Sequence, residues 1–118
     1  MRFDQFTVAF LLRRPEAPKL DDRAAAELQD AHMAHLARLH DEGVLLAAGP
    51  VSAGPNPNLR GISIYRGPID EARTRAEQDP TCVAGQLTQE FFTWTVPAGT
   101  VTFHSSRFPR SMSEVGSG

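Results

Sequence analysis

The chain has 118 residues, of which 41% are hydrophobic and 22% are charged, and its formal net charge is -2 at pH 7. These values are typical of one globular domain, and they argue against a disordered chain, a collagen or a disulfide scaffold. Because phosphate binding usually needs a basic face, the slightly acidic balance also argues against nucleic acid or an anionic membrane surface as the main partner.

Two long elements are predicted in the first part of the chain. Residues 6–12 are a short run of β-branched, aromatic and apolar side chains, which is typical of a buried strand. After a proline-containing loop, Asp21 and Asp22 provide an N-cap and negative charge for a helix start. Residues 23–42 contain no proline or glycine, so they predict a long helix that Gly43 ends as a C-cap.

The following segments predict three more strands and a second helix. Residues 44–48 are apolar and favour a buried strand, and residues 60–65 alternate as expected for another. A shorter helix is expected over residues 69–78, ended by an Asp-Pro pair. Residues 86–96 predict the fourth strand, which residues 101–103 extend or complement with a short edge strand.

This order of elements predicts a fold. Strand, helix, strand, strand, helix, strand is the ferredoxin-like (split βαβ) order, so we expect an α+β domain with a four-stranded antiparallel sheet and both helices on one face. The other face would be uncovered, with Phe10, Phe92 and Trp94 among its candidates for exposure. An apolar face of this size usually has a partner, and a face-to-face homodimer is the simplest closed arrangement.

The two ends of the chain predict no separate domain. Residues 105–118 are mostly serine, glycine, proline and charged residues without periodicity, so we expect a flexible or draped tail after a domain of residues 1–104. The longest apolar run near the start, residues 8–12, is far too short to cross a bilayer. Because no secretion or transit signal is recognisable, we expect a cytoplasmic protein.

His32 is the most informative residue of the long predicted helix. At about 100° per residue, four apolar side chains fall within roughly 40° of it: Leu28, Leu39, Ala25 and Leu36. His35 lies on the flank of this stripe and His40 lies further off its other side, so His32 is expected at the centre of the buried face. A buried imidazole needs hydrogen bonds at both nitrogens. His32 is therefore either a structural core histidine or a general acid or base in a pocket.

Asp79 is the natural carboxylate partner for His32. Both predicted helices lie on the same face of the sheet, so the fold allows the two residues to meet. The alternative is that Asp79, which precedes Pro80, is only a turn device at a helix end.

Metal and cofactor sites are poorly supported. His32 and His35 are three residues apart and share a helix face, but a third ligand is present only if His104 or Asp79 reaches them. Neither a Gly-x-Gly-x-x-Gly run nor a Walker lysine motif occurs, and the only lysine, Lys19, lies in a proline-rich loop. We therefore expect no metal and no cofactor.

Cys82 is the single cysteine of the chain, so an internal disulfide and a Cys-x-x-Cys zinc pattern are both excluded. Its thiol is either a nucleophile or a small, buried or half-buried side chain, and no neighbouring residue indicates that it is activated.

Several runs together resemble the YciI-like (YCII-related) family. They are Ala-His at 31–32, Leu-His-Asp-Glu-Gly at 39–43 and Leu-Leu-Ala-Ala-Gly-Pro at 45–50, followed by Ala-Glu-Gln-Asp-Pro at 76–80 and Val-Ala-Gly at 83–85. The resemblance covers about residues 5–97. It implies a ferredoxin-like fold that pairs as a dimeric α+β barrel, and it places the family's proposed catalytic histidine and aspartate at His32 and Asp79. One branch of the family eliminates chloride from a chlorinated hydroxyhydroquinone and has a serine shortly before the aspartate, where Ala76 stands in this chain.

These observations predict a cofactor-independent enzyme that performs proton transfer, by isomerisation, elimination or lactone-type chemistry, on a small organic molecule. His32 would be the general acid or base and Asp79 would orient it. The residues expected around the substrate are Phe10, His35, Gly49, Pro50, Ser52 and Trp94. For Phe10 and Trp94 the alternative is that they form the dimer face. The alternative is a non-catalytic ligand-binding or accessory module in which His32 and Asp79 are a buried structural pair.

Overall fold

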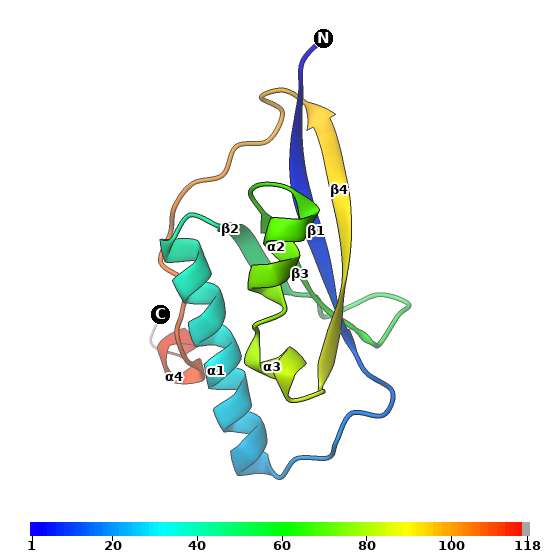
Figure 1. Ribbon diagram of the computed structural model, residues 1–118. Coiled ribbons are helices and arrows are strands. Elements are labelled where there is room, and N and C mark those ends of the chain that lie inside the picture. The colour runs from blue at the N-terminus through cyan, green and yellow to red at the C-terminus, as the bar shows by residue number, and fades with distance from the viewer. Residues whose placement is uncertain (117–118) are drawn as a thin grey trace.

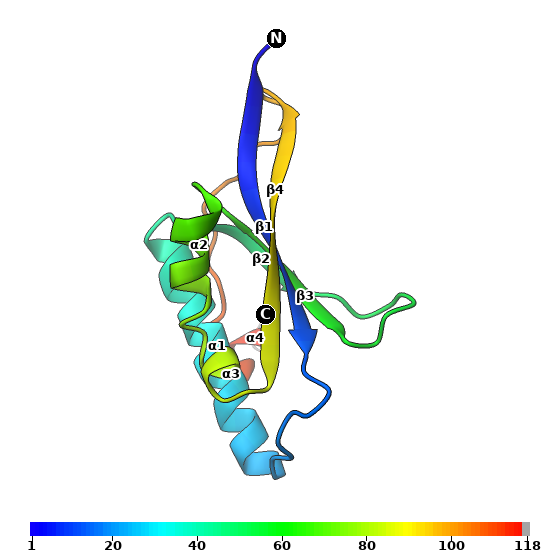
Figure 2. The same ribbon diagram turned by 45° about the vertical axis from the view of Figure 1, so that its right-hand side comes forward.

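The computed structural model describes residues 1–116 and has a four-stranded antiparallel sheet with its helices packed on one side (Figures 1 and 2). The strands are β1 (Phe3–Arg13), β2 (Leu45–Pro50), β3 (Leu59–Tyr65) and β4 (Leu87–Pro97), in the sheet order β2-β3-β1-β4. The helices are α1 (Asp22–Asp41), α2 (Ile69–Ala76), α3 (Pro80–Val83) and α4 (Met112–Val115). The predicted α+β, ferredoxin-like arrangement is confirmed.

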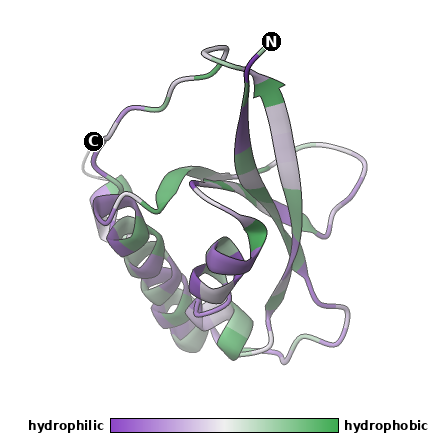
Figure 3. Ribbon diagram, turned by 45° about the horizontal axis from the view of Figure 1, so that its top comes forward, coloured by the Kyte–Doolittle hydropathy of each residue, from purple (hydrophilic) through white to green (hydrophobic). Residues whose placement is uncertain are grey.

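Helix α1 begins and ends where its capping residues require. Asp21 Oδ1 accepts a hydrogen bond of 2.7 Å from the Ala24 amide, which satisfies a free N–H of the first turn. At the other end, the Gly43 amide donates a hydrogen bond to the backbone carbonyl of His40, and the Val44 amide donates one to the backbone carbonyl of Leu39. Together these two hydrogen bonds form a Schellman motif. Gly43 has φ +79°, a left-handed conformation that glycine adopts without the steric cost of a Cβ. Figure 3 shows hydrophilic and hydrophobic residues alternating along α1, as in an amphipathic helix.

The two faces of the sheet differ in the size of their side chains. In β1, Thr7, Ala9 and Leu11 are buried on the side of the helices, and the alternating residues Phe6 and Phe10 lie on the other side. Ala9 and Leu11 belong to a core that also contains the following residues: Leu39, Leu45, Tyr65, Ala72 and Ala76. The side chains in contact with α1 and α2 are therefore mostly small or aliphatic, and the large aromatic residues of β1 lie on the opposite face.

The uncovered face of the sheet carries an aromatic cluster. Phe6 contacts Trp94 at 6.1 Å between ring centroids and Phe103 at 5.2 Å, and Phe10 contacts Phe92 at 5.6 Å. Phe92 is 50% exposed and Trp94 is 39% exposed. In Figure 2 the helices lie on one side of the sheet and leave this face open. No helix among residues 1–116 is long and apolar enough to cross a membrane.

Two segments differ from the sequence-based prediction. Helix α2 ends at Ala76, and Asp79 then caps a further short helix, α3, because its side chain accepts from the Thr81 amide. Residues 101–103 form neither an extension of β4 nor an edge strand. Phe103 instead packs on Phe6, and the chain leaves the sheet there.

The segment of residues 105–116, called here the C-terminal segment, lies along α1 (Figure 1). The Ser106 amide donates a 3.0 Å hydrogen bond to His40 Nε2, and the Phe108 ring stacks on the His40 imidazole at 3.9 Å. The Met112 amide donates to Asp30 at the start of α4. The predicted boundary between a domain of residues 1–104 and a tail stays a prediction.

Candidate active site

A pocket of about 610 Å³ lies between α1, the helix side of the sheet and the C-terminal segment. Its wall is mainly apolar and includes Leu11 of β1, Leu28 and Leu36 of α1, and Phe108. Met112 of α4 also lines it. A concave, mostly apolar space of this volume, with a few polar groups, is the usual form of a small-molecule site.

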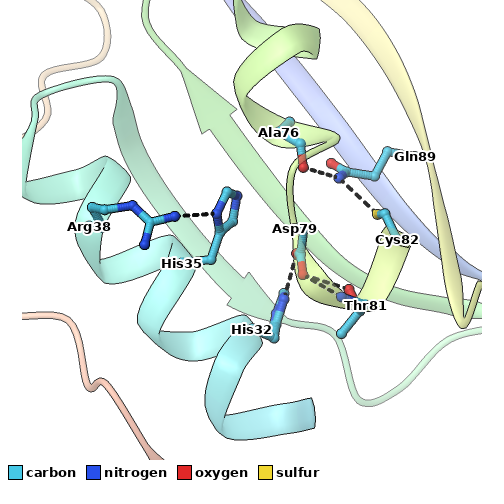
Figure 4. A network of polar contacts seen from close by, with 8 residues as sticks. All are labelled: His32, His35, Arg38, Ala76, Asp79, Thr81, Cys82 and Gln89. Atoms are coloured by element: carbon cyan, nitrogen blue, oxygen red, sulfur yellow. Dashed lines mark hydrogen bonds and ion pairs between the residues drawn. The ribbon is translucent and has the colours of Figure 1, made fainter. Parts of the chain in front are cut away.

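His32 of α1 lines this pocket and pairs with Asp79 at the N-terminus of α3 (Figure 4). His32 Nδ1 lies 2.6 Å from Asp79 Oδ2, although 47 residues separate them in the sequence. Asp79 is 1% exposed, and its Oδ1 accepts hydrogen bonds from the Thr81 amide at 2.9 Å and the Thr81 hydroxyl at 2.8 Å. Both carboxylate oxygens are therefore engaged, and the carboxylate is held in one orientation.

The surroundings of Asp79 keep it ionised. Burial of the carboxyl group by itself opposes ionisation, but the hydrogen bond and charge of His32, together with the hydrogen bonds from Thr81, outweigh it and lower the pKa of Asp79 below its ordinary value. A carboxylate is an acceptor only, so Nδ1 of His32 carries a proton and donates it to Asp79.

The second ring nitrogen of His32 is then the basic one when the imidazole is neutral. Within residues 1–116, Nε2 of His32 makes no hydrogen bond to another residue, and the His32 side chain is 14% exposed. An imidazole oriented by a carboxylate through one nitrogen, with the other nitrogen available beside a pocket, is suited to take up or give a proton.

A match to a family profile establishes the family to which this chain belongs. The YCII-related domain matches residues 8–93, which is more than half of the chain. The chain belongs to the YCII-related family. Comparison with curated proteins gave no match.

The fold of this YCII-related protein is similar to that of a solved enzyme. This is the 5-chloro-2-hydroxyhydroquinone dehydrochlorinase of Burkholderia phenoliruptrix AC1100, solved in complex with 2,5-dihydroxybenzoquinone. The TM-score is 0.55, the sequence identity is 21%, and the match covers 75% of this chain and 92% of the other. At this level of identity the likeness shows the fold alone.

Some of the residues predicted to surround the substrate line the pocket, and others lie outside it. Gly49 and Pro50, at the end of β2, line the pocket. Ser52 is exposed in the following loop and does not line it. Phe10 and Trp94 do not line it either, because the alternation of β1 and β4 puts them on the uncovered face of the sheet.

His35, another predicted pocket residue, is buried in the packed interior and does not line the pocket. Its side chain is 2% exposed, Nδ1 accepts a 3.2 Å hydrogen bond from Arg38, and Nε2 is buried with no partner among the described residues. Burial lowers the pKa of His35, so the ring is neutral at pH 7. His32 faces the pocket together with Leu28 and Leu36 of the predicted stripe, but it is less deeply buried than His35, which the wheel placed on the flank.

The other sequence candidates are occupied in structural contacts or lie away from the pocket. His40 uses both nitrogens, since Nδ1 contacts the Leu45 carbonyl at 2.7 Å and Nε2 accepts from Ser106. Burial raises the pKa of the Cys82 thiol, which favours the protonated form, and Gln89 donates to its sulfur. Within residues 1–116, no three His, Cys, Asp or Glu side chains form a group that could hold a metal ion.

Sequence reasoning missed one wall of the pocket entirely. Phe108, Pro109, Met112 and Val115 line it from the C-terminal segment, which lies beyond the YCII-related match at residue 93. The segment gave no periodic signal, and only Phe108 stands out in it as a large aromatic residue.

Proposed function

We propose that this protein is a cofactor-independent enzyme that transfers a proton to or from a small organic molecule. The observation that carries the proposal is the His32–Asp79 pair at the wall of an apolar pocket, with Nε2 of His32 unengaged by the described residues. Asp79 orients the imidazole and stabilises the imidazolium that forms when Nε2 accepts a proton.

The chemistry that suits this pair starts from a carbon acid. Nε2 of His32 removes a proton from a carbon next to a carbonyl group, and the electron pair of the C–H bond forms the C=C bond of an enolate, whose negative charge lies on the carbonyl oxygen. If His32 returns the proton to another carbon, the result is an isomerisation; if a leaving group departs with an electron pair, the result is an elimination. Elimination is the reaction named for the dehydrochlorinase that shares the fold, which supports this class as one of the two.

Proton exchange with solvent tests the proposal directly. We expect the protein to catalyse deuterium uptake from D₂O, or product formation, in one or more members of a panel of small enolisable ketones, lactones and phenols followed by NMR. A His32→Gln variant should be slower by about 10²- to 10⁴-fold, the usual contribution of a general base.

The control for this experiment is His104→Gln, which changes an exposed histidine outside the pocket. It should retain the full rate. A folded His32→Gln variant with an undiminished rate would contradict the proposal. Compounds that bind the pocket without any exchange would instead favour the second candidate, a non-catalytic small-molecule-binding module.

We also propose that the enzyme is a homodimer that pairs through the uncovered face of its sheet. A twofold axis brings the same aromatic cluster of both copies together and removes it from water. The free thiol of Cys82 is compatible with the reducing cytoplasm, where we expect the enzyme to act.

The dimer is tested by measuring the mass in solution. Wild-type protein should sediment as a dimer, and Phe92→Lys, which puts a charge into the aromatic cluster, should sediment as a monomer. Val83→Lys is the matched control because Val83 is an exposed apolar residue of α3. A monomeric wild type, or a dimeric Phe92→Lys variant, would overturn this pairing.

A further inference from the structure

The ionisable residues that line the pocket are of one sign. Arg13 and Arg60 line it together with His32, and no aspartate or glutamate does. The chain as a whole has 14 acidic and 12 basic residues, so the absence of acidic side chains from the pocket wall does not follow from the overall composition. The wall therefore has an excess of positive charge next to apolar side chains.

Arg13 and Arg60 lie on paired strands at the same end of the sheet. Arg13 is the last residue of β1, and its amide donates a 2.8 Å hydrogen bond to the Asn58 carbonyl just before β3. The register of β1 and β3 is irregular between Leu11 and Leu12, opposite Arg60. Adjacent strands are about 4.8 Å apart, so the two arginines are close enough to share one ligand group.

Neither arginine is neutralised within the described chain. No side-chain hydrogen bond or ion pair joins Arg13 or Arg60 to another of residues 1–116. Several other arginines of the chain do have carboxylate partners: Arg14, Arg23, Arg75, Arg107 and Arg110. A guanidinium group has five N–H donors in a planar fork that matches a carboxylate, so two exposed arginines beside an apolar pocket suit an anion.

We propose that the substrate of this pocket is a small carboxylate: a molecule with an apolar, ring-sized body and one carboxylate group that Arg13 and Arg60 bind. The inference rests on the proposed function, because it names the substrate class of the same pocket. The apolar body contacts the leucine side chains of the wall, and binding of the carboxylate at the strand end limits the positions that the body can take beside His32. The arginines are specificity-determining residues, and His32 remains the group that moves the proton.

Binding measurements with matched ligand pairs test this inference. The ligand pairs are phenylacetate with phenylacetamide and cyclohexanecarboxylate with cyclohexanecarboxamide, and their affinities are measured by isothermal titration calorimetry. Each carboxylate should bind the wild-type protein about 10- to 100-fold more tightly than its amide, because a charge-assisted hydrogen bond contributes more binding free energy than a neutral one. The double variant Arg13→Gln/Arg60→Gln should bind the carboxylates as weakly as the amides. Its affinity for the amides should be unchanged.

The control variant is Arg2→Gln/Arg23→Gln, which removes the same charge from exposed positions outside the pocket. It should keep the wild-type preference for carboxylates. Equal affinity of the wild type for the carboxylate and amide of each pair would overturn the inference, and so would an unchanged preference in the folded Arg13→Gln/Arg60→Gln variant.

A further variant separates this inference from the proposed function. His32→Gln should still prefer the carboxylates, because the arginines are intact. If it does, and no proton exchange is found in the wild type with any compound, the proposed reaction is wrong and the ligand class stands. If proton transfer depends on His32 but the arginine variant turns over carboxylate and uncharged substrates with the wild-type preference, the ligand class is wrong and the reaction stands.

Discussion

An Asp79→Ala variant is expected to lose about 3–5 kcal/mol of its free energy of unfolding at pH 7, because three hydrogen bonds to a buried carboxylate are lost together. The substitution removes the acceptor of the His32 ring N–H and of both hydrogen bonds from Thr81. Because Asp79 is 1% exposed, water does not readily replace these bonds. The measurement is urea unfolding followed by circular dichroism.

Asp79→Asn is the second variant, and it keeps the test informative if the alanine variant does not fold. Asparagine retains an oxygen for Thr81 but has an amide nitrogen where the carboxylate accepted the proton of His32 Nδ1. The imidazole is then expected to move its proton to Nε2, which removes the base from the pocket. Proton transfer should fall by at least about 10²-fold, while the protein remains folded.

The contribution of Asp79 to stability should depend on pH in a defined direction. Its pKa is lower in the folded protein than in the unfolded chain, where an aspartate has a pKa of about 3.9. The unfolded chain therefore binds the proton first as the pH falls. The stabilisation is complete above about pH 4 and is lost as the pH falls through the lower, folded pKa.

The pH effect is measured as the difference in free energy of unfolding between the wild type and Asp79→Asn. This difference should shrink as the pH falls below about pH 4. Glu77→Gln is the control, because Glu77 is an exposed carboxylate two residues away. A difference that stays constant down to pH 2.5 would mean that the folded protein does not hold Asp79 in its ionised form.

The main elements were predictable because their signals are local. The helix α1 follows from an aspartate N-cap, a run without glycine or proline, and Gly43 at its end, and the cap hydrogen bonds are those that the sequence indicates. The approach of His32 to Asp79 was different in kind. The two residues are 47 positions apart in the sequence and lie on different helices, so the hydrophobic periodicity of one helix cannot predict that they meet. The family resemblance supplied the pair, and the geometry shows that it is formed.

The faces of β1 could not be assigned because both are apolar. Thr7, Ala9 and Leu11 alternate with Phe6, Val8 and Phe10, and strand alternation alone gives no reason to prefer either set for the helix side. The smaller set is buried under the helices, which allows close packing there. As a result, Phe10 was predicted both for the uncovered face and for the pocket; it lies on the uncovered face, and Leu11 lines the pocket.

The helix wheel had a related limit. It finds the apolar stripe of α1, but it does not show where along the helix the packing is closed and where it opens into a pocket. His35 and Leu39 lie in the closed part and His32 borders the open part, so the most central residue of the wheel is more exposed than its neighbour on the flank. The exposure of His32 depends on the other walls of the pocket, and the C-terminal segment forms one of them.

A chain ended after His104 is expected to stay folded and to lose ligand affinity by at least about 10-fold. All four strands, α1, α2 and α3 lie before that residue, so the sheet and most of its core remain. The pocket loses the wall that Phe108 and Met112 provide. His40 loses its stacked ring and the N–H that its Nε2 accepts, so we also expect a lower melting temperature.

A point substitution separates the wall from the fold. Phe108→Ala should weaken binding of an apolar-bodied ligand about 10-fold, because removing a partly buried phenyl ring from a pocket wall forfeits about 1.5 kcal/mol of contact with the ligand. Phe3→Ala is the matched control, since Phe3 is exposed at the start of β1 and does not line the pocket. If the shortened chain and Phe108→Ala both bind as tightly as the wild type, the C-terminal segment covers α1 without forming part of the site. If both weaken binding while His32-dependent proton transfer continues, the segment selects the ligand and the YCII-related core carries the chemistry.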